Sequence, residues 1–298
     1  MDALRTQDER FANHPGWPYV PRYIDDLKGF EGLRLHYIDE GSIDARYCFL
    51  CLHGEPTWAY LYRRMIPVFL AAGGRVVAPD FFGFGRSDKP VADATYTWDF
   101  HRDTLLRIVE RLELGRITLV VQDWGGLLGL TLPVSIPDRI ERLLIMNTGF
   151  GTGDKVSDGF IAWRDYAAKN PDLAVGRLIA RGTPHMTAAE IAAYDAPFPD
   201  ARHKAGVRRF PQIVPTRPDM DGAAVSRQAL AWWRDEFNGK SFMAIGMKDP
   251  VFGLPDMMAM HQVIRGCPEP LRITEGGHFV QEWGEDIARA AIANWGGA

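Results

Sequence analysis

Apolar runs separated by segments with helical spacing dominate the hydrophobic pattern of this chain. Residues 33–41 alternate apolar and polar side chains and end at a glycine, which predicts a half-exposed strand. The later runs are almost continuously apolar and predict strands at 48–52, 75–80, 117–121, 142–147, 241–246 and 271–274. Apolar positions at helical spacing predict helices at 58–70, 98–112, 223–236 and 282–294. This alternation predicts an α/β fold whose mostly parallel sheet is flanked by helices.

The alternation breaks between residues 151 and 218, where no strand-like run occurs. Short helical patterns at 160–168, 173–180 and 188–194 are separated by prolines in this stretch. We therefore interpret 151–218 as a helical cap inserted into a core domain that is formed by 1–150 and 219–298. The site of a parallel α/β sheet lies beyond the carboxyl ends of its strands, so the cap would cover that site as a lid.

The composition limits what this chain can bind. It has 298 residues, 46% hydrophobic and 24% charged, and its net charge of −4 argues against a nucleic-acid partner. The amino terminus is charged where a signal peptide needs an apolar core, and no run has the length of a membrane span. Three cysteines are too few for a disulfide framework, and Cys48 and Cys51 lie inside an apolar run. We expect a cytoplasmic monomer without membrane contact.

Asp123 occupies the position where a buried strand turns abruptly into a helix. The strand 117–121 is followed by Gln-Asp-Trp-Gly-Gly and then by a helix-like start. Esterases and lipases place a nucleophilic serine at such a turn, and the next backbone N–H belongs to the oxyanion hole. An aspartate at a helix start can also be a simple cap. The surrounding motifs favour Asp123 as a nucleophile, with the N–H of Trp124 in the oxyanion hole.

Two further loops at strand ends carry groups that fit this chemistry. Asp249 follows the strand 241–246, and His278 lies between the strand 271–274 and the last helix. The order Asp123, Asp249, His278 is the order of nucleophile, acid and histidine in the α/β-hydrolase triad. Taken singly, Asp249 could be a turn residue and His278 a helix cap. Because all three follow strands in the right order, we predict a catalytic triad.

The segment His53-Gly54-Glu55-Pro56 follows the buried strand 48–52. In α/β-hydrolases this position supplies the second N–H of the oxyanion hole, which here is the N–H of Glu55. The Gly and Pro of this segment also suit an ordinary loop, and both interpretations can hold. No group of His, Cys and carboxylate residues has metal-ligand spacing, so we expect no metal and no cofactor.

An aspartate nucleophile suggests a reaction different from that of a serine hydrolase. It is already ionised near neutral pH and can attack a saturated carbon, expelling a leaving group and forming an alkyl ester. His278, oriented by Asp249, then has only to activate water against that ester. Halides and the oxygen of a strained epoxide are leaving groups that fit.

Several motifs of this chain closely resemble those of haloalkane dehalogenases. The resemblance covers nearly the whole sequence, is weakest in the cap, and is carried by Val121–Gly126, His53–Trp58, Asp80–Pro90 and Gly276–His278. It implies the subfamily that has Glu after His-Gly; the other main subfamily has a halide-binding Asn there and its triad acid at the place of Asn147. It also implies a halide site formed by the indoles of Trp124 and Trp163, with Phe160 lining the substrate pocket. An ionised Glu55 would have no proton to donate to a halide.

The resemblance implies hydrolysis of haloalkanes with water to an alcohol, a halide ion and a proton. The closest alternative is an epoxide hydrolase, a class that is similar in its triad. Such an enzyme needs acids on the cap to protonate the epoxide oxygen, usually two tyrosines, and Tyr166 and Tyr194 are candidates. Fluoroacetate dehalogenases are similar in their nucleophile but have an Asp-Arg-Gly elbow, so Trp124 argues against that class. A catalytically inactive binding protein on the same fold would need neither Asp123 nor His278. Trp98, Trp232 and Trp233 are expected in the core.

Overall fold

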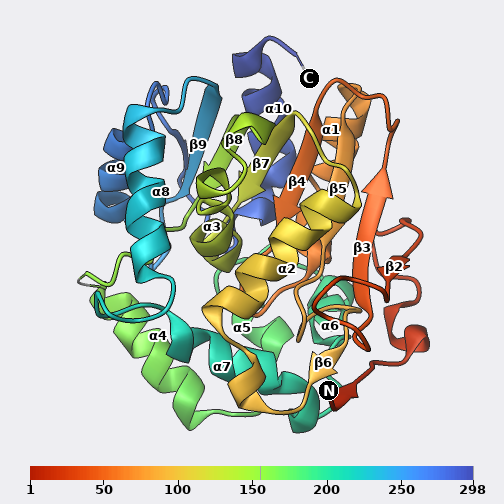
Figure 1. Ribbon diagram of the computed structural model, residues 1–298. Coiled ribbons are helices and arrows are strands. Elements are labelled where there is room, and N and C mark those ends of the chain that lie inside the picture. The colour runs from red at the N-terminus through yellow and green to blue at the C-terminus, as the bar shows by residue number, and fades with distance from the viewer. Residues whose placement is uncertain (155, 298) are drawn as a thin grey trace.

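An eight-stranded sheet forms the centre of the molecule, as the computed structural model in Figure 1 shows for residues 1–154 and 156–297. The strand order is β10-β9-β8-β7-β4-β5-β3-β2. All neighbours from β10 to β5 are parallel, and only the β5–β3 and β3–β2 pairs are antiparallel. The strands are β2 (Arg22–Ile24), β3 (Leu35–Glu40), β4 (Cys48–Leu52), β5 (Arg75–Pro79), β7 (Ile117–Val121), β8 (Ile140–Met146), β9 (Lys240–Gly246) and β10 (Leu271–Ile273). The predicted mostly parallel α/β sheet is confirmed.

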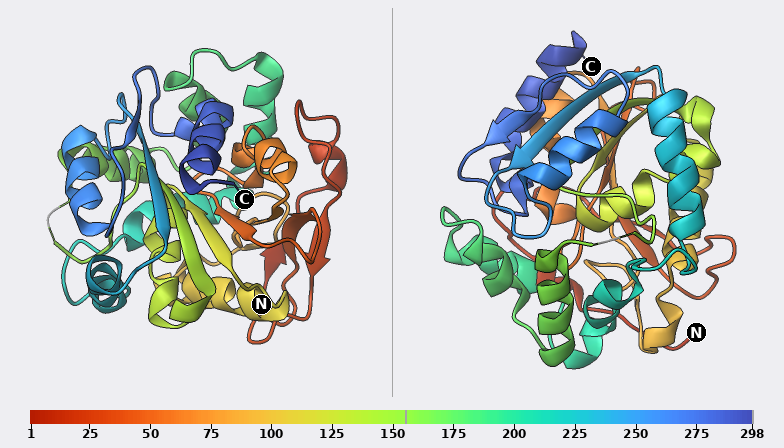
Figure 2. Two further views of the ribbon diagram at one scale, coloured as in Figure 1. Left: turned by 90° about the horizontal axis from the view of Figure 1, so that it is seen from above. Right: turned by 90° about the vertical axis from the view of Figure 1, so that its left-hand side faces the viewer.

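Helices cover both faces of this sheet. Viewed along its edge, α1 (Ile66–Ala71) and α10 (Gly284–Trp295) lie on one face, while α2 (Trp98–Arg111), α3 (Asp123–Gly129) and α8 (Ala223–Asp235) lie on the other (Figure 2). The strands β4, β5 and β7 are buried at every residue, as their continuous apolar runs predict. Parallel strands with two covered faces have no solvent-exposed side, which explains why these runs show no polar alternation.

The alternating run at 33–41 is less exposed than its pattern predicts. The first four residues of β3 are buried, and His36 among them has no exposed surface. Its Nδ1 atom lies 2.7 Å from Oδ2 of Asp80, which is also fully buried. A polar side chain can be buried when it finds a hydrogen-bond partner, and that partner comes from a distant loop that periodicity does not reveal.

Four helices lie together beyond the carboxyl ends of the parallel strands, at the lower side of Figure 1. They are α4 (Asp158–Lys169), α5 (Val175–Arg181), α6 (Ala188–Asp195) and α7 (Ala205–Ile213), and all fall within the predicted cap, 151–218. The first three match the predicted helical patterns. The sequence prediction missed α7, because Pro211 lies inside it and a proline cannot donate the helical hydrogen bond.

Other elements also differ from the sequence prediction. The expected helix 58–70 is two pieces, a 3₁₀ turn at Ala59–Tyr62 and α1, with Pro67 in the first turn of the second piece. Proline suits a first helical turn and therefore favours a new start at this point. The prediction also missed α9 (Leu254–Val263), which packs beside α8 and β9. It missed the short strand β2 as well, and the two-stranded sheet formed by β1 (Ala3–Leu4) and β6 (Lys89–Pro90). Among the described residues, no helix has the length and apolar character that crossing a membrane requires.

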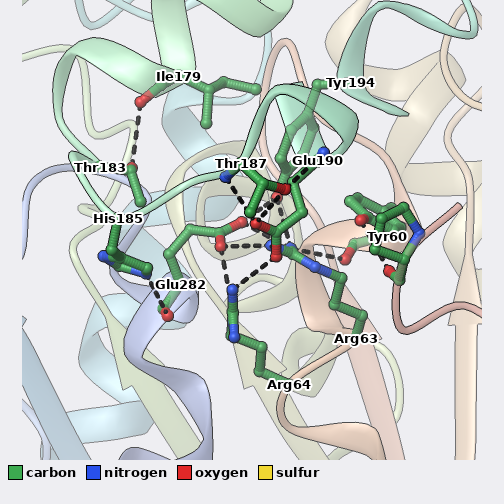
Figure 3. A network of polar contacts seen from close by, with 11 residues as sticks. Tyr60, Arg63, Arg64, Ile179, Thr183, His185, Thr187, Glu190, Tyr194 and Glu282 are labelled. Carbon is green, nitrogen blue, oxygen red and sulfur yellow. Dashed lines mark hydrogen bonds and ion pairs between the residues drawn. The ribbon is translucent and has the colours of Figure 1, made fainter. Parts of the chain in front are cut away.

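A buried group of charged side chains joins the cap to the core (Figure 3). Arg63, just before α1, donates to both carboxylate oxygens of Glu282, at 2.7 and 2.6 Å, and to Glu190 of α6 at 2.9 Å. Arg64 donates to the same oxygen of Glu190 at 2.6 Å, and the Tyr194 hydroxyl donates to Glu282. We call these five residues the cap–core network. It fixes α6 over the core by ion pairs from which water is largely excluded.

Candidate active site

The side chain of Asp123 projects from the sharp turn between β7 and α3. Its backbone has φ of +49°, in the left-handed region that non-glycine residues rarely adopt. Neighbouring glycines make room for this turn: a Cβ at Gly54 would lie 2.6 Å from the Asp123 side chain, and one at Gly125 would lie 1.9 Å from the carbonyl oxygen of Leu52. The Asp-Trp-Gly-Gly and His-Gly motifs therefore pack against each other through their glycines.

Two distant groups contact the two carboxylate oxygens of Asp123. The backbone N–H of Glu55 donates to Oδ1 at 2.8 Å, and Nε2 of His278 lies 3.3 Å from Oδ2. The backbone of the turn is fixed as well, because the Thr148 hydroxyl donates to the carbonyl oxygen of Asp123 at 2.7 Å. The carboxylate thus has one oxygen bound to a backbone donor and the other facing an imidazole.

His278 is held between two carboxylates. Its Nδ1 atom lies 2.8 Å from Oδ2 of Asp249, on the side opposite to Asp123. Gln122, which sequence reasoning missed as a site residue, donates to the carbonyl oxygen of His278 at 3.0 Å and fixes its loop. The signal for Gln122 was its position directly before the elbow. The structure thus brings together the three residues that the sequence predicts as a triad.

The mutual arrangement of these groups shifts their pKa values. Burial alone would lower the pKa of His278, but the charges of Asp249 and Asp123 and the hydrogen bonds to them raise it to about 10. Burial would raise the pKa of Asp249, but the charge of His278 and its hydrogen bond, together with backbone donors, hold that pKa below its ordinary value. The two neighbouring carboxyl groups therefore favour the protonated form of this imidazole.

Asn147 lies at the position where the resemblance places the triad acid of the other subfamily. Its side chain connects the end of β8 to the end of β9 and to the loop that follows β9. Its side-chain amide donates to the carbonyl oxygens of Gly246 at 3.1 Å and Phe252 at 3.0 Å, and its Oδ1 accepts the N–H of Gly246 at 2.7 Å. Both N–H donors and the carbonyl oxygen of this amide therefore help to hold β9 and the loop that carries Asp249.

A cavity of about 790 Å³ opens between the cap and the triad. Asp123 and His278 lie in its wall, together with three aromatic residues predicted from the sequence, Trp124, Phe160 and Trp163. Ser157 caps α4, accepting the N–H of Phe160 at 3.1 Å and donating to the carbonyl oxygen of Val251 at 2.7 Å. This link fixes the start of α4, and with it the wall of the cavity, to the loop that follows Asp249.

The other tryptophans and tyrosines considered in the sequence are distributed differently. Trp98 and Trp233 are buried in the core as expected, and Trp98 packs against Trp124 with ring centroids 5.4 Å apart. Trp232, which was also expected in the core, is only half-buried and packs against it. Tyr166 lines the cavity, whereas Tyr194 is fully buried in the cap–core network. No group of side chains among residues 1–154 and 156–297 has the geometry of a metal site.

The sheet order, the inserted helices and the elbow define a class of protein, the α/β-hydrolases. A family model for the alpha/beta hydrolase fold matches residues 47–285. Among solved structures, haloalkane dehalogenase DpaA from Paraglaciecola agarilytica NO2 superposes with a TM-score of 0.97, at 51% identity and with 98% of each chain covered.

Curated relatives narrow this class further. A haloalkane dehalogenase of Psychrobacter cryohalolentis is 44% identical over 98% of this chain and 97% of its own length. Another, from Mycolicibacterium paratuberculosis, is 42% identical over 99% of this chain and 98% of its own length. The chain belongs to the haloalkane dehalogenase family of α/β-hydrolases, and the resemblance seen in its motifs is confirmed.

Proposed function

We propose that this hydrolase of carbon–halogen bonds works through a covalent alkyl ester on Asp123. The observation that carries the proposal is the position of its carboxylate between the Glu55 N–H and the imidazole of His278. Oδ1 is engaged by a backbone donor, which leaves Oδ2 to attack the halogen-bearing carbon. A carbon–oxygen bond forms, the carbon–halogen bond breaks, and the halide leaves with the bonding electron pair.

Ester formation prepares His278 for the second step. The raised pKa of His278 depends partly on the Asp123 charge, and an ester carries no charge, so the imidazole can lose its proton more easily. The neutral imidazole then takes a proton from water as the oxygen attacks the ester carbonyl. The alcohol leaves with the other proton of that water. His278 keeps the proton that it takes from water, so the one proton released per turnover is the one that the imidazole loses to solvent after the ester forms. Asp123 is restored as a carboxylate.

The oxyanion formed in this step is Oδ1 of Asp123. The Glu55 N–H already donates to this oxygen at 2.8 Å, so the donor is in place before charge develops. We assign the second donor to the backbone N–H of Trp124. Two indole N–H groups in the cavity wall, those of Trp124 and Trp163, would bind the halide, and Phe160 would contact the alkyl chain.

An epoxide hydrolase would need acids that protonate the epoxide oxygen. Of the two candidate tyrosines, Tyr166 reaches the cavity, but the hydroxyl of Tyr194 donates to Glu282 in the cap–core network. Among the described residues, Tyr166 is the one tyrosine in the wall, which favours halide over epoxide as the leaving group. The family relatives favour the same choice.

A matched pair of variants tests the proposal. His278→Gln should still be alkylated, so excess bromoalkane should release one halide per active site and leave a stable adduct on Asp123, which intact-protein mass spectrometry detects. Asp123→Asn, mixed with the same bromoalkane, should release no halide and carry no adduct. Halide release by His278→Gln without an adduct would mean that water attacks directly, and the covalent scheme would be wrong.

Two further sequence predictions remain to be measured. We infer a monomeric, cytoplasmic enzyme, although the solved structure of DpaA is tetrameric. Light scattering of the purified protein should give the mass of one chain, 33.4 kDa. A mass of four chains would show a tetramer, as in DpaA, and the monomer would be wrong. Fractionation of cells that express the chain would test the cytoplasmic location.

A further inference from the structure

The carboxyl group of Glu55 is buried in the wall of the active-site cavity without a cation. Only 4% of the residue is exposed, and Oε1 has no hydrogen-bond partner within the described part of the chain. The ion pairs found among those residues do not include Glu55. A buried polar atom that finds no partner in the protein alone points to a ligand that supplies one.

Three site residues face this carboxyl group. The charge of Asp123 acts on this group, and the Glu55 backbone N–H contacts Oδ1 of Asp123 at 2.8 Å. Trp163 and His278 both lie close enough to this carboxyl group to act on its ionisation. Glu55 therefore lies close to both the nucleophile and the cap tryptophan that we assign to the halide.

The electrostatic balance at this position favours the neutral acid. Burial and then the charge of Asp123 raise the pKa of Glu55 well above its ordinary value, while His278 and the Trp163 indole oppose this shift without overcoming it. Arg181, Lys248, Asp154 and Asp256 also line the cavity, with two positive and two negative charges among them. Burial and the charge of Asp123 thus oppose the ionised form of Glu55 that was assumed from the sequence.

We propose that Glu55 is held as a neutral carboxylic acid and that its O–H is a further hydrogen-bond donor to the departing halide. The proposal rests on the proposed function, because it places the halide between Trp124 and Trp163. A neutral carboxylic acid has one O–H donor, whereas a carboxylate in the same place has none and would repel the anion. The proton stays on Glu55 throughout, so the balance of the reaction is unchanged.

Halide binding distinguishes the two protonation states by the sign of the effect. Glu55→Gln keeps a neutral donor of the same shape, and Glu55→Leu removes it. Titration of bromide, followed by quenching of tryptophan fluorescence, should give binding about tenfold or more weaker in Glu55→Leu than in Glu55→Gln. If Glu55 were ionised, removing its charge would strengthen bromide binding in both variants, and the proposal would be overturned.

Infrared spectroscopy gives a second readout that does not depend on tryptophan. In D₂O, the parent enzyme should show a carbonyl band of an un-ionised carboxylic acid that Glu55→Gln lacks, and bromide should shift that band. Glu190→Gln is the matched control, because burial would raise the pKa of Glu190 but Thr187 and Arg63 lower it to about 2, and this variant should keep the band. A parent spectrum without the band would refute the neutral acid.

The two proposals can fail separately. If His278→Gln forms no adduct on Asp123, the covalent function fails, whatever Glu55 does. If the adduct forms but Glu55→Leu binds bromide as tightly as Glu55→Gln, only the assignment of Glu55 is wrong. Thermal unfolding of both Glu55 variants shows whether they are folded when bromide is added.

Discussion

Glu55 and Glu282 are both almost fully buried, with 4% and 2% of each residue exposed, but their surroundings are opposite. Glu282 receives two hydrogen bonds from the guanidinium of Arg63 and one from the Tyr194 hydroxyl. Glu55 faces a carboxylate, an imidazole and an open cavity instead. Burial alone therefore does not determine whether a carboxyl group is charged or what it does; its nearest partners do.

The difference also separates stability from function. In the cap–core network, charges from the core and from α6 neutralise one another (Figure 3). Its five residues are not among those that line the cavity. In the cavity wall, by contrast, Oε1 of Glu55 has no hydrogen-bond partner among the described residues. We expect substitutions in the network to change mainly the free energy of unfolding and substitutions in the cavity to change mainly catalysis.

The largest effect that tests this comparison is expected for Arg63→Met. Removing the guanidinium leaves Glu282 buried without its main partner, which should lower the free energy of unfolding by about 3–5 kcal/mol. Urea denaturation measures this loss. Arg64→Met is the control, because Arg64 is 34% exposed and its ion pairs should contribute about 1 kcal/mol or less. Equal losses in both variants would contradict the view that burial makes the Arg63 pairing essential.

Trp163→Phe should show the reverse behaviour, with catalysis lost and stability kept. Removing one preorganised donor for the leaving halide should lower kcat/KM for a bromoalkane about 10²-fold, which corresponds to about 2.7 kcal/mol. Bromide should also bind more weakly. The half-buried Trp232 offers a matched substitution outside the cavity wall, and Trp232→Phe should react at the parent rate. A parent rate in Trp163→Phe would show that the donor was assigned to the wrong tryptophan.

The smallest effects are expected from a pair of isosteric substitutions that should act in opposite directions. Near neutral pH, Glu190→Gln should lower the free energy of unfolding by about 1–3 kcal/mol, because an ionised hydrogen-bond acceptor is lost. Glu55→Gln should raise the free energy of unfolding modestly. At neutral pH the parent chain takes up a proton on Glu55 when it folds, which costs free energy that a glutamine avoids. Chemical denaturation at pH 7 measures both, and a loss of stability in Glu55→Gln would argue against a neutral acid.

The pH dependence of the same pair follows from the direction of each pKa shift. Glu190 has its pKa lowered to about 2, so its contribution is present above the ordinary value of 4.5 and is lost as pH falls toward 2. Glu55 has a raised pKa, so the unfolded chain ionises first as pH rises, and the advantage of Glu55→Gln should grow above pH 4.5. Parallel pH profiles for the two variants would contradict the difference between the two regions.

The sequence by itself determined the parts of this protein that are local in the chain. Continuous apolar runs identified the parallel strands, because a strand covered on both faces needs no polar side. The order of Asp123, Asp249 and His278 after those strands predicted three residues that the structure places together, because parallel strands bring their carboxyl ends to one edge. Helix α7 was missed because Pro211 breaks the local rule, and packing against the core outweighs the lost hydrogen bond.

Only the tertiary structure decided the state and role of the buried polar groups. Nothing local distinguishes Tyr166, in the cavity wall, from Tyr194, in the cap–core network. The residues around Glu55 come from the turn after β7, from α4 and from the loop after β10, and their charges influence whether it keeps its proton. The free energy of a buried charge depends on partners within a few ångströms in space, whatever their separation in the chain.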